Sequence, residues 1–157
     1  MGRIEERLAE LGLTVPPVNP PVAAYVPALR DGRYVYVSGQ LPLAGGAMAA
    51  TGPVGEGPDA VSPEQAKEMA ATCALNAIAA CQSVVGDLDA VERVVKLVGF
   101  VASEPGFTGQ PGVINGASEL MKDVFGEAGA HARSAVGVLA LPLGASVEVE
   151  AIFAVRD

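Results

Sequence analysis

Several residue types on which large classes of protein depend are scarce in this chain of 157 residues. It has no Trp, three Tyr and four Phe, so it lacks the aromatic platforms on which single-stranded nucleic acids stack. Its 10 Lys and Arg residues are scattered and are outnumbered by 18 Asp and Glu residues, which gives a net charge of −8. Phosphate backbones bind where cations cluster, so we expect no nucleic-acid partner.

Long apolar runs are also missing. A membrane-spanning helix needs about 20 consecutive apolar residues, and no run in this sequence approaches that length. The first residues, MGRIEERLAELG, form a charged amphipathic segment rather than a secretory signal. We therefore expect a cytoplasmic protein that does not bind membranes.

Cysteine and histidine are too few to form a metal cluster. Cys73 and Cys81 lie on one predicted helix with about 12 Å between their Cα atoms, so they cannot form a disulfide with each other, and small buried thiols are the favoured interpretation. His131 is the only histidine and has neither a nucleophile nor a metal ligand beside it in the sequence. Such a residue is more typical of a structural role, and we leave it out of the predicted site. We expect no metal and no organic cofactor.

Half of the residues are apolar, which at this length is enough for one domain with its own core, spanning residues 1–157. Residues 1–20 extend this domain at its N-terminus. Residues 44–61 are mostly Gly, Pro and small side chains, which is typical of a surface loop that covers the domain flexibly. The loop lacks the Lys-Ser/Thr pair of a nucleoside-triphosphate site, so we expect no phosphate to bind there.

Hydrophobic periodicity and turn residues predict the order α-β-β-α-β-α-β-β. Ser62 and Pro63 mark the beginning of the longest helix, and Asp31-Gly32 marks a hairpin turn. The expected helices are 3–11, 62–86 and 111–126, and the expected strands are 24–30, 33–39, 91–102, 135–141 and 147–155. This order predicts an α+β fold with two main helices on one face of a mixed sheet of four to six strands. Because two helices leave the other face uncovered, we also expect self-association.

The tail from His131 to Val155 carries charges that a core hairpin does not need. Its two strands and the Pro-Gly turn between them predict an antiparallel hairpin. Arg133 lies where the first strand begins, and Glu148 and Glu150 lie two residues apart on one face of the second. A guanidinium and a carboxylate on neighbouring strands would then share a pocket. A surface ion pair is the alternative that the residues alone leave open.

Five stretches together carry a resemblance to a known family. They are Tyr25, the run VSGQLPL from Val37 to Leu43, the strand that ends VGFVAS, Asn115 in the last predicted helix, and the tail RSAVGVLALPLGASVEVEAIFAV. In combination they resemble the RidA/YjgF family of reactive-intermediate deaminases, formerly called the L-PSP endoribonuclease family. The likeness covers nearly the whole chain.

The resemblance implies a chorismate-mutase-like α+β fold, a homotrimer, and clefts between subunits in which 2-imino acids are hydrolysed to 2-keto acids and ammonia. It implies that Arg133 grips the substrate carboxylate and that Glu150 positions the attacking water. Periodicity alone does not choose between Glu150 and Glu148. Tyr25, Ser38, Gly39 and Asn115 match residues that line the same cleft.

One position departs from the family pattern. Where the family's deaminases commonly have a cysteine two residues after the arginine, this chain has Ala135. This departure, the N-terminal extension and the long glycine-rich loop indicate a divergent subgroup. A non-catalytic protein that binds small carboxylates is the alternative to a deaminase, and a ribonuclease or translation inhibitor is disfavoured by the acidic composition.

Overall fold

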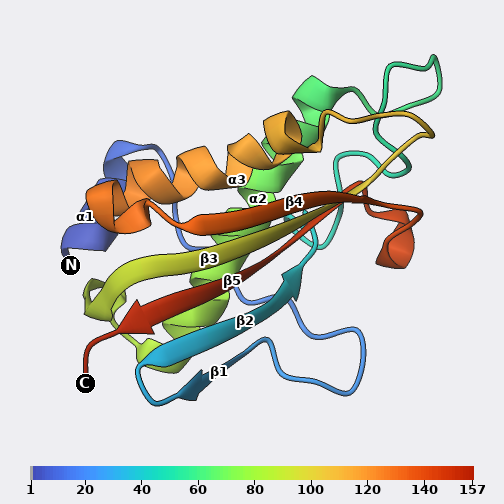
Figure 1. The fold of residues 1–157 in the computed structure, drawn as a ribbon. Helices are drawn as coiled ribbons and strands as arrows, with labels where there is room; N and C mark the ends of the chain where they lie inside the picture. Colours follow the sequence, from blue (N-terminus) through green and yellow to red (C-terminus); the bar gives the residue numbers. More distant parts are fainter. Residues whose placement is uncertain (1) are drawn as a thin grey trace.

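Among residues 2–157, which the computed structural model describes, five strands form one sheet in the order β1-β2-β5-β3-β4 (Figure 1). The strands are β1 (Ala28–Asp31), β2 (Tyr34–Gln40), β3 (Val91–Ala102), β4 (Ala132–Val138) and β5 (Val147–Val155). The helices are α1 (Arg3–Glu10), α2 (Pro63–Val85) and α3 (Gln110–Phe125), with short 3-10 turns η1 (Leu88–Ala90), η2 (Gly126–Gly129) and η3 (Pro142–Gly144). The predicted α+β fold and the predicted order of elements are confirmed.

The first two strands form the hairpin that Asp31-Gly32 predicts. β1 and β2 pair antiparallel, and Gly32 has a φ of 63°, which suits a tight turn. β1 begins four residues later than predicted, at Ala28, because Pro27 has no N–H to donate to a strand ladder. In β2 the valines at 35 and 37 are buried, whereas Tyr34 and Tyr36 are 46% and 44% exposed on the other face.

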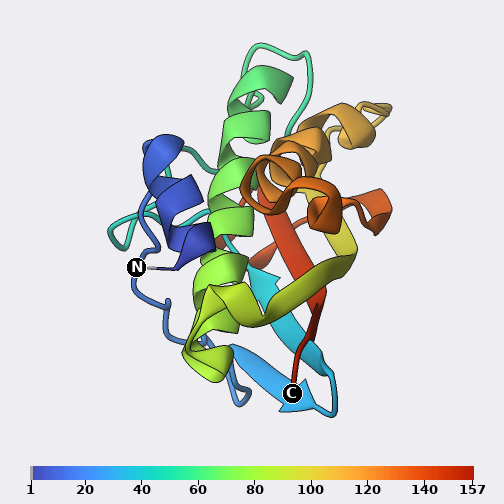
Figure 2. The same cartoon turned by 90° about the vertical axis from the view of Figure 1, so that its left-hand side faces the viewer.

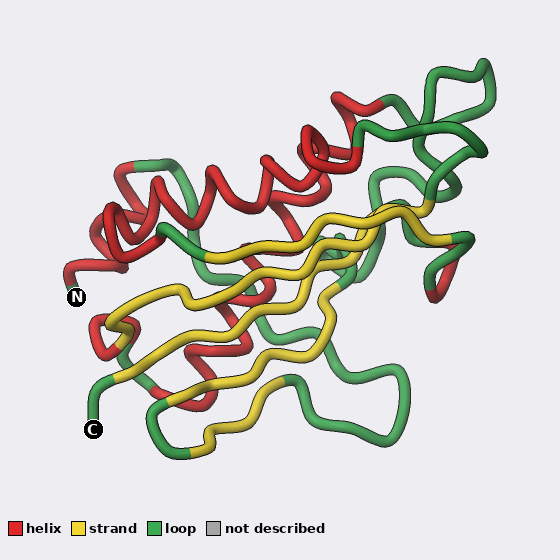
Figure 3. The backbone as a smooth tube through the Cα atoms, viewed as in Figure 1, coloured by secondary structure: helices red, strands yellow, loops and turns green. Residues whose placement is uncertain are grey.

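The predicted antiparallel hairpin in the C-terminal tail is wrong. β4 pairs in parallel with β3, and β5 lies between β2 and β3 (Figure 3). The segment around η3 therefore carries the chain across the end of β3 instead of folding it back on β4. β5 has a buried residue at every second position and takes a central place, whereas β4 has no fully buried residue and forms an edge.

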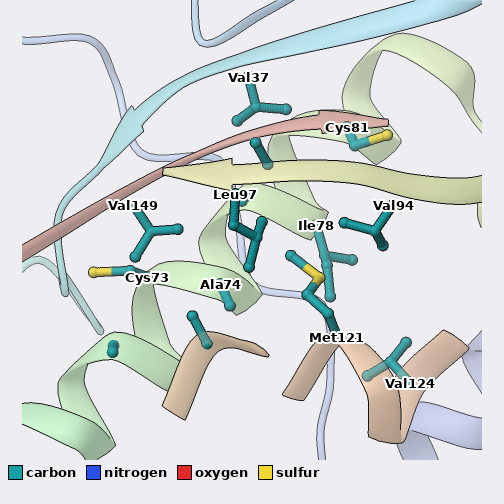
Figure 4. Close-up of a cluster of buried hydrophobic side chains, with 14 of the residues drawn as sticks. Val37, Cys73, Ala74, Ile78, Cys81, Val94, Leu97, Met121, Val124 and Val149 are labelled. Carbon is teal, nitrogen blue, oxygen red and sulfur yellow. The ribbon is translucent and has the colours of Figure 1, made fainter. Parts of the chain in front are cut away.

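Two long helices cover one face of the sheet, as predicted (Figure 2). α2 begins after Ser62, whose Oγ accepts a hydrogen bond of 3.1 Å from the N–H of Gln65, and it ends at Gly86 with a φ of 82°. Side chains from α2, α3 and the sheet interdigitate in the core, where Ile78, Leu97 and Met121 meet (Figure 4).

Among the described helices, α2 alone has the length and composition of a membrane span. Its inner side is packed against the sheet and α3, and residues such as Met69, Cys73 and Ile78 are buried there. These are the properties of a core helix in an α+β protein.

Both cysteines lie on the buried side of α2 and are free thiols. Burial raises the pKa of Cys73 well above its usual value and raises that of Cys81 to about 12. Thiols held in the neutral form this strongly are poor nucleophiles and poor metal ligands. The predicted structural role of the two cysteines agrees with this environment.

The N-terminal helix is fastened to the domain rather than projecting from it. Ile4 and Leu8 are buried, and the backbone N–H groups of Arg3 and Ile4 donate to the Asp89 carboxylate at 2.9 and 2.8 Å. These two hydrogen bonds lower the pKa of Asp89. Arg7 reaches α3 and donates from Nε to the carbonyl of Asp123 at 2.8 Å.

The glycine-rich loop 44–61 is held against the sheet by its backbone. Val54 is fully buried, and its N–H donates to the carbonyl of Ala102 at 2.7 Å. The N–H of Gly57 donates to the Glu104 carboxylate at 3.0 Å, and Ser146 Oγ donates to the carbonyl of Gly52 at 2.6 Å. These contacts place the loop beside the ends of β3 and β5, and its predicted flexibility stays a prediction.

The face of the sheet opposite α2 and α3 is open. Leu29 on β1, Tyr36 on β2 and Val136 on β4 are 49%, 44% and 44% exposed on this face. None of the described helices covers them. An apolar sheet face of this kind is usually covered by another chain.

Candidate active site

A bulge in β2 shapes one half of the candidate site. Val37 pairs with Ala151 and Gln40 pairs with Val149, so both Ser38 and Gly39 stand opposite a single residue of β5, which is Glu150. The bulge thus brings three of the predicted site residues together.

The backbone around the bulge is fixed by hydrogen bonds. Ser38 Oγ donates to the carbonyl of Val26 at 2.6 Å, and Gln40 Nε2 donates to the carbonyl of Ser38 at 3.1 Å. A Cβ atom at Gly39 would come within 2.8 Å of Glu148 Cδ, so a larger residue here would push the Glu148 carboxylate away from the backbone.

Two hollows lie beside the bulge, and three residues line both of them. A hollow of about 520 Å³ lies on the open sheet face, and we call it the sheet-face hollow. A second of about 490 Å³ lies between β2 and the N-terminal segment that precedes β1, and we call it the N-terminal hollow. Tyr25, Ser38 and Glu150 line both, and Gly39 and Glu148 line the second. Four predicted site residues, Tyr25, Ser38, Gly39 and Glu150, therefore lie together.

The two glutamates on β5 share this region but differ in environment. Burial raises the pKa of Glu148, and the neighbouring charge of Glu150 adds to the increase. Among the described residues, neither carboxylate has a hydrogen-bond or ion-pair partner in the protein. Glu150 lines both hollows and is free to bind water or ligand, whereas Glu148 lines only the N-terminal hollow and lies against the backbone of Gly39.

The raised pKa of Glu148 predicts that Glu148→Gln stabilises the protein at neutral pH. A carboxyl whose pKa is higher in the folded state favours folding while it is protonated, and that contribution is lost as the pH rises through its folded-state pKa. Glutamine has no charge to desolvate, so the variant is expected to unfold at a higher temperature than the wild type at pH 7. The difference should shrink as the pH falls through the raised folded-state pKa and should be absent below 4.5, the ordinary value for this group.

Thermal unfolding of Glu148→Gln and wild type between pH 4 and pH 8 measures this effect. Glu92→Gln, at an exposed acid that pairs with Arg33, is the matched control and should show no such pattern. A variant that is less stable than wild type at pH 7 would contradict the electrostatic environment assigned to Glu148.

Arg133 lies apart from this group, at the edge of the sheet. It pairs with Leu97, whose buried side chain points toward the helices, whereas Glu150 pairs with the next residue of β3, Val98. Neighbouring residues of a strand point to opposite faces, so Arg133 and Glu150 face opposite sides of the sheet. β3 also lies between their strands, which corrects the prediction that the two charges lie on neighbouring strands and share a pocket within one chain.

The side chain of Arg133 is held against α3. Its Nη1 donates to Asn115 Oδ1 at 2.8 Å and to Ser118 Oγ at 3.3 Å. Ser118 Oγ also lies 2.8 Å from His131 Nε2. Asn115 therefore belongs with Arg133, and neither residue lines the two hollows beside the bulge.

Two polar neighbours of Arg133 were absent from the predicted site. Ser118 follows Asn115 by three residues and so lies on the same face of α3, and His131 precedes Arg133 by two residues. The helical spacing from Asn115 was a usable signal for Ser118. His131 lacked one, because its partner is 13 residues away in the sequence. Lys96, on the wall of the sheet-face hollow, was also missed.

No group of three or more potential metal ligands occurs within residues 2–157. The charged groups of the candidate site are the guanidinium of Arg133, the ammonium of Lys96 and the carboxylates of Glu148 and Glu150, and the other polar groups are neutral donors and acceptors. Such groups can bind a carboxylate and transfer protons to and from water.

Comparison with known proteins gives the class of protein to which this fold and site belong. The family model described as Endoribonuclease L-PSP matches residues 17–155. The chain is 46% identical over 154 residues to Protein TCP17 of Trypanosoma cruzi, covering 96% of this chain and 93% of that protein. The chain belongs to the L-PSP family, which is the YjgF/RidA family.

Two solved structures are similar along most of their length. The crystal structure of Atu1372 from Agrobacterium tumefaciens, a protein of unknown function, is 48% identical with a TM-score of 0.89, covering 98% of this chain and 92% of that one. RidA from the Antarctic bacterium Psychrobacter is 29% identical with a TM-score of 0.58, covering 88% of this chain and 94% of that one. The fold and family implied by the sequence resemblance are thus confirmed.

Proposed function

We propose that this protein is a hydrolytic deaminase of 2-imino acids, acting in the cytoplasm as a homotrimer whose sites are shared by neighbouring subunits. The observation that carries the proposal is the carboxylate of Glu150, which lines two hollows of about 500 Å³ with Tyr25 and Ser38 and has no partner among the described residues. A partly buried carboxylate without a partner can accept a proton from water. Membership of the RidA family supplies the class of reaction.

The shared site follows from the position of Arg133. Within one chain its guanidinium faces the helices while Glu150 faces the open side of the sheet. One substrate cannot touch both groups of a single chain, so Arg133 and Asn115 of one copy would complete the hollow beside Glu150 of the next. The apolar residues exposed on the open face, such as Tyr36 and Val136, give the copies a surface on which to associate.

The proposed chemistry asks for two main contributions. Arg133 binds the substrate carboxylate as a charged donor and holds the iminium carbon near Glu150. Glu150 removes a proton from water as it attacks the C=N carbon, which forms a carbinolamine. The protonated Glu150 then returns this proton to the nitrogen. As the C–N bond breaks, the carbinolamine hydroxyl gives its proton to the Glu150 carboxylate and the C=O bond forms, so that the 2-keto acid and ammonia leave. Glu150 passes that last proton to the ammonia, which becomes ammonium.

The experiment is a coupled assay with in situ substrate. An amino-acid oxidase or a dehydratase generates 2-iminopropanoate or 2-iminobutanoate, and an NADH-dependent dehydrogenase reports the 2-keto acid as it forms. The protein is expected to raise the rate above that of spontaneous hydrolysis, in proportion to its concentration. A rate equal to the spontaneous one at micromolar protein would contradict the proposal.

Ala135 favours one alternative function. It lies on the helix-facing side of β4, two residues after Arg133 and on the same face, where the family's deaminases commonly have a cysteine. A protein that binds small carboxylates without hydrolysing imines would keep Arg133 and tolerate this change. Binding of 2-oxobutanoate without any increase in the hydrolysis rate would favour this alternative.

A further inference from the structure

A hydrogen-bonded chain behind Arg133 runs from its guanidinium to the backbone of η2. Arg133 Nη1 lies 3.3 Å from Ser118 Oγ, Ser118 Oγ lies 2.8 Å from His131 Nε2, and His131 Nδ1 lies 2.6 Å from the carbonyl oxygen of Gly129. The four groups come from β4, α3, the segment before β4, and η2. Asn115, Ser118, His131 and Arg133 thus form one connected polar cluster at the edge of the sheet.

Each member of this chain has a fixed role as donor or acceptor. A carbonyl oxygen only accepts, so His131 Nδ1 carries the proton that it donates to Gly129. In the neutral imidazole the other nitrogen then accepts from the hydroxyl of Ser118. The Ser118 Oγ can then accept a hydrogen bond from Nη1 of Arg133. All three hydrogen bonds point the same way, from Arg133 to Gly129, and bonds aligned in this manner strengthen one another.

The far end of the chain is rigid. Gly129 is buried, and a Cβ atom there would lie 2.7 Å from the carbonyl carbon of Met121 and 2.8 Å from the Cα of Lys122. The backbone of η2 therefore lies directly on that of α3, and the Gly129 carbonyl has little freedom to turn away from His131.

These contacts use one nitrogen of the guanidinium and leave one edge free. The two hydrogens of Nη1 go to Asn115 Oδ1 and Ser118 Oγ. Within the described part of the chain, Nε and Nη2 have no hydrogen-bond partner. The N–H of Nε and one N–H of Nη2 are parallel and point away from the protein's other contacts with Arg133. This pair of donors matches the spacing of the two oxygens of a carboxylate.

We infer that Ser118 and His131 are positioning residues of the proposed deaminase, which hold Arg133 so that its Nε and Nη2 edge receives the substrate carboxylate. The inference rests on the proposed function and deepens it. It also assigns Asn115 to the same task, as the second group that fixes Nη1 rather than as a direct contact of the substrate.

The test measures binding of 2-oxobutanoate, a stable product analogue, by calorimetry on the full-length protein. Ser118→Ala is expected to raise the Kd and the KM about tenfold, the size expected when a hydrogen bond to a charged group is lost, with kcat changed by less than about twofold. Binding of 2-oxobutanamide, which has no carboxylate, should not change. Ser118→Thr keeps the hydroxyl and should restore binding, and Ser83→Ala, at a serine bonded only within α2, is the matched control.

A double variant separates positioning from a general loss of structure. In an Arg133→Ala background, Ser118→Ala should cause no further loss of 2-oxobutanoate binding, because it acts only through the guanidinium. His131→Phe should weaken binding in the same direction as Ser118→Ala, and it tests the chain independently if Ser118→Ala does not fold.

Different results would contradict the positioning role of Ser118 and His131 and the proposed deaminase function. The positioning role alone would be overturned if the wild-type protein binds 2-oxobutanoate and hydrolyses imines, but Ser118→Ala and His131→Phe have the same Kd as the wild type. The positioning role would also be overturned if Ser118→Ala weakened the binding of 2-oxobutanoate and 2-oxobutanamide equally. It would be overturned as well if Ser118→Ala weakened 2-oxobutanoate binding further in the Arg133→Ala background. A wild-type protein that neither binds 2-oxobutanoate nor hydrolyses imines would overturn the proposed function, and with it this inference.

Discussion

Arg133→Ala is expected to lower imine hydrolysis to near the spontaneous rate and to raise the Kd of 2-oxobutanoate by a factor on the order of 100, so that weak binding is still measurable at high ligand concentration. The guanidinium is the group that the proposed site offers to the substrate carboxylate, and truncating one partner of such a charge pair costs about 2–5 kcal/mol. Since 1.36 kcal/mol corresponds to a factor of ten, we expect kcat/KM to fall by a factor of about 30 to 5,000. The coupled assay measures the rate, and calorimetry measures the Kd.

Arg33→Ala is the matched control for this variant. Arg33 pairs with Glu92 at the exposed beginning of β2, away from both hollows, so its removal should leave turnover within about twofold of wild type. Unchanged turnover in Arg133→Ala, with a normal circular dichroism spectrum, would show that the carboxylate is bound elsewhere.

Glu150→Gln is expected to lower kcat by a factor of about 100 to 10,000, the usual contribution of a general base. Its effect on the Kd of 2-oxobutanoate should be less than about threefold, because glutamine keeps the shape of the side chain and Arg133 still holds the carboxylate. This combination of a lost kcat and a retained Kd distinguishes the water-positioning acid from the carboxylate-binding arginine.

Glu148→Gln is the comparison that decides between the two acids of β5. Glu148 lies on the same face as Glu150 and lines the N-terminal hollow, but it packs against Gly39. If Glu148→Gln loses kcat and Glu150→Gln does not, the assignment of the general base is wrong.

Mixing the two inactive variants tests the shared site. In a trimer assembled at random from Arg133→Ala and Glu150→Gln chains, a site that takes its arginine from one copy and its glutamate from the next is intact in roughly a quarter of cases. Unfolding and refolding the variants together should therefore restore about that fraction of wild-type activity, while each variant refolded alone stays inactive. A mixture without activity, or a monomer in sedimentation at micromolar concentration, would contradict inter-subunit sites.

Local signals in the sequence were sufficient for much of the fold. The turn at Asp31-Gly32 and the cap at Ser62 depend on residues within a few positions of each other, and both are found as predicted. Such features follow from the conformational preferences of short segments, which the rest of the protein reinforces.

The family motif anticipated which residues of β2 and β5 lie near one another, but not the polar contacts of Arg133. The family motif brought Tyr25, Ser38, Gly39 and Glu150 into one group, and the structure places them around one bulge. The hydrogen-bonded chain through Ser118 and His131 has no short-range signature, because its members meet only when η2 lies against α3. A lone histidine in the sequence gave no indication of its partner.

The sequence by itself determined the kinds of element, their order and the family, because these depend on periodicity, turn chemistry and motif. Only the tertiary structure decided which strands are neighbours. The tail reads as a simple hairpin, yet β5 lies at the centre of the sheet, where α2 covers its alternate buried residues and both of its edges pair with strands, and β4 is left at the edge. That choice separates Arg133 from Glu150 within one chain, and it is the physical reason why the proposed site needs a second copy.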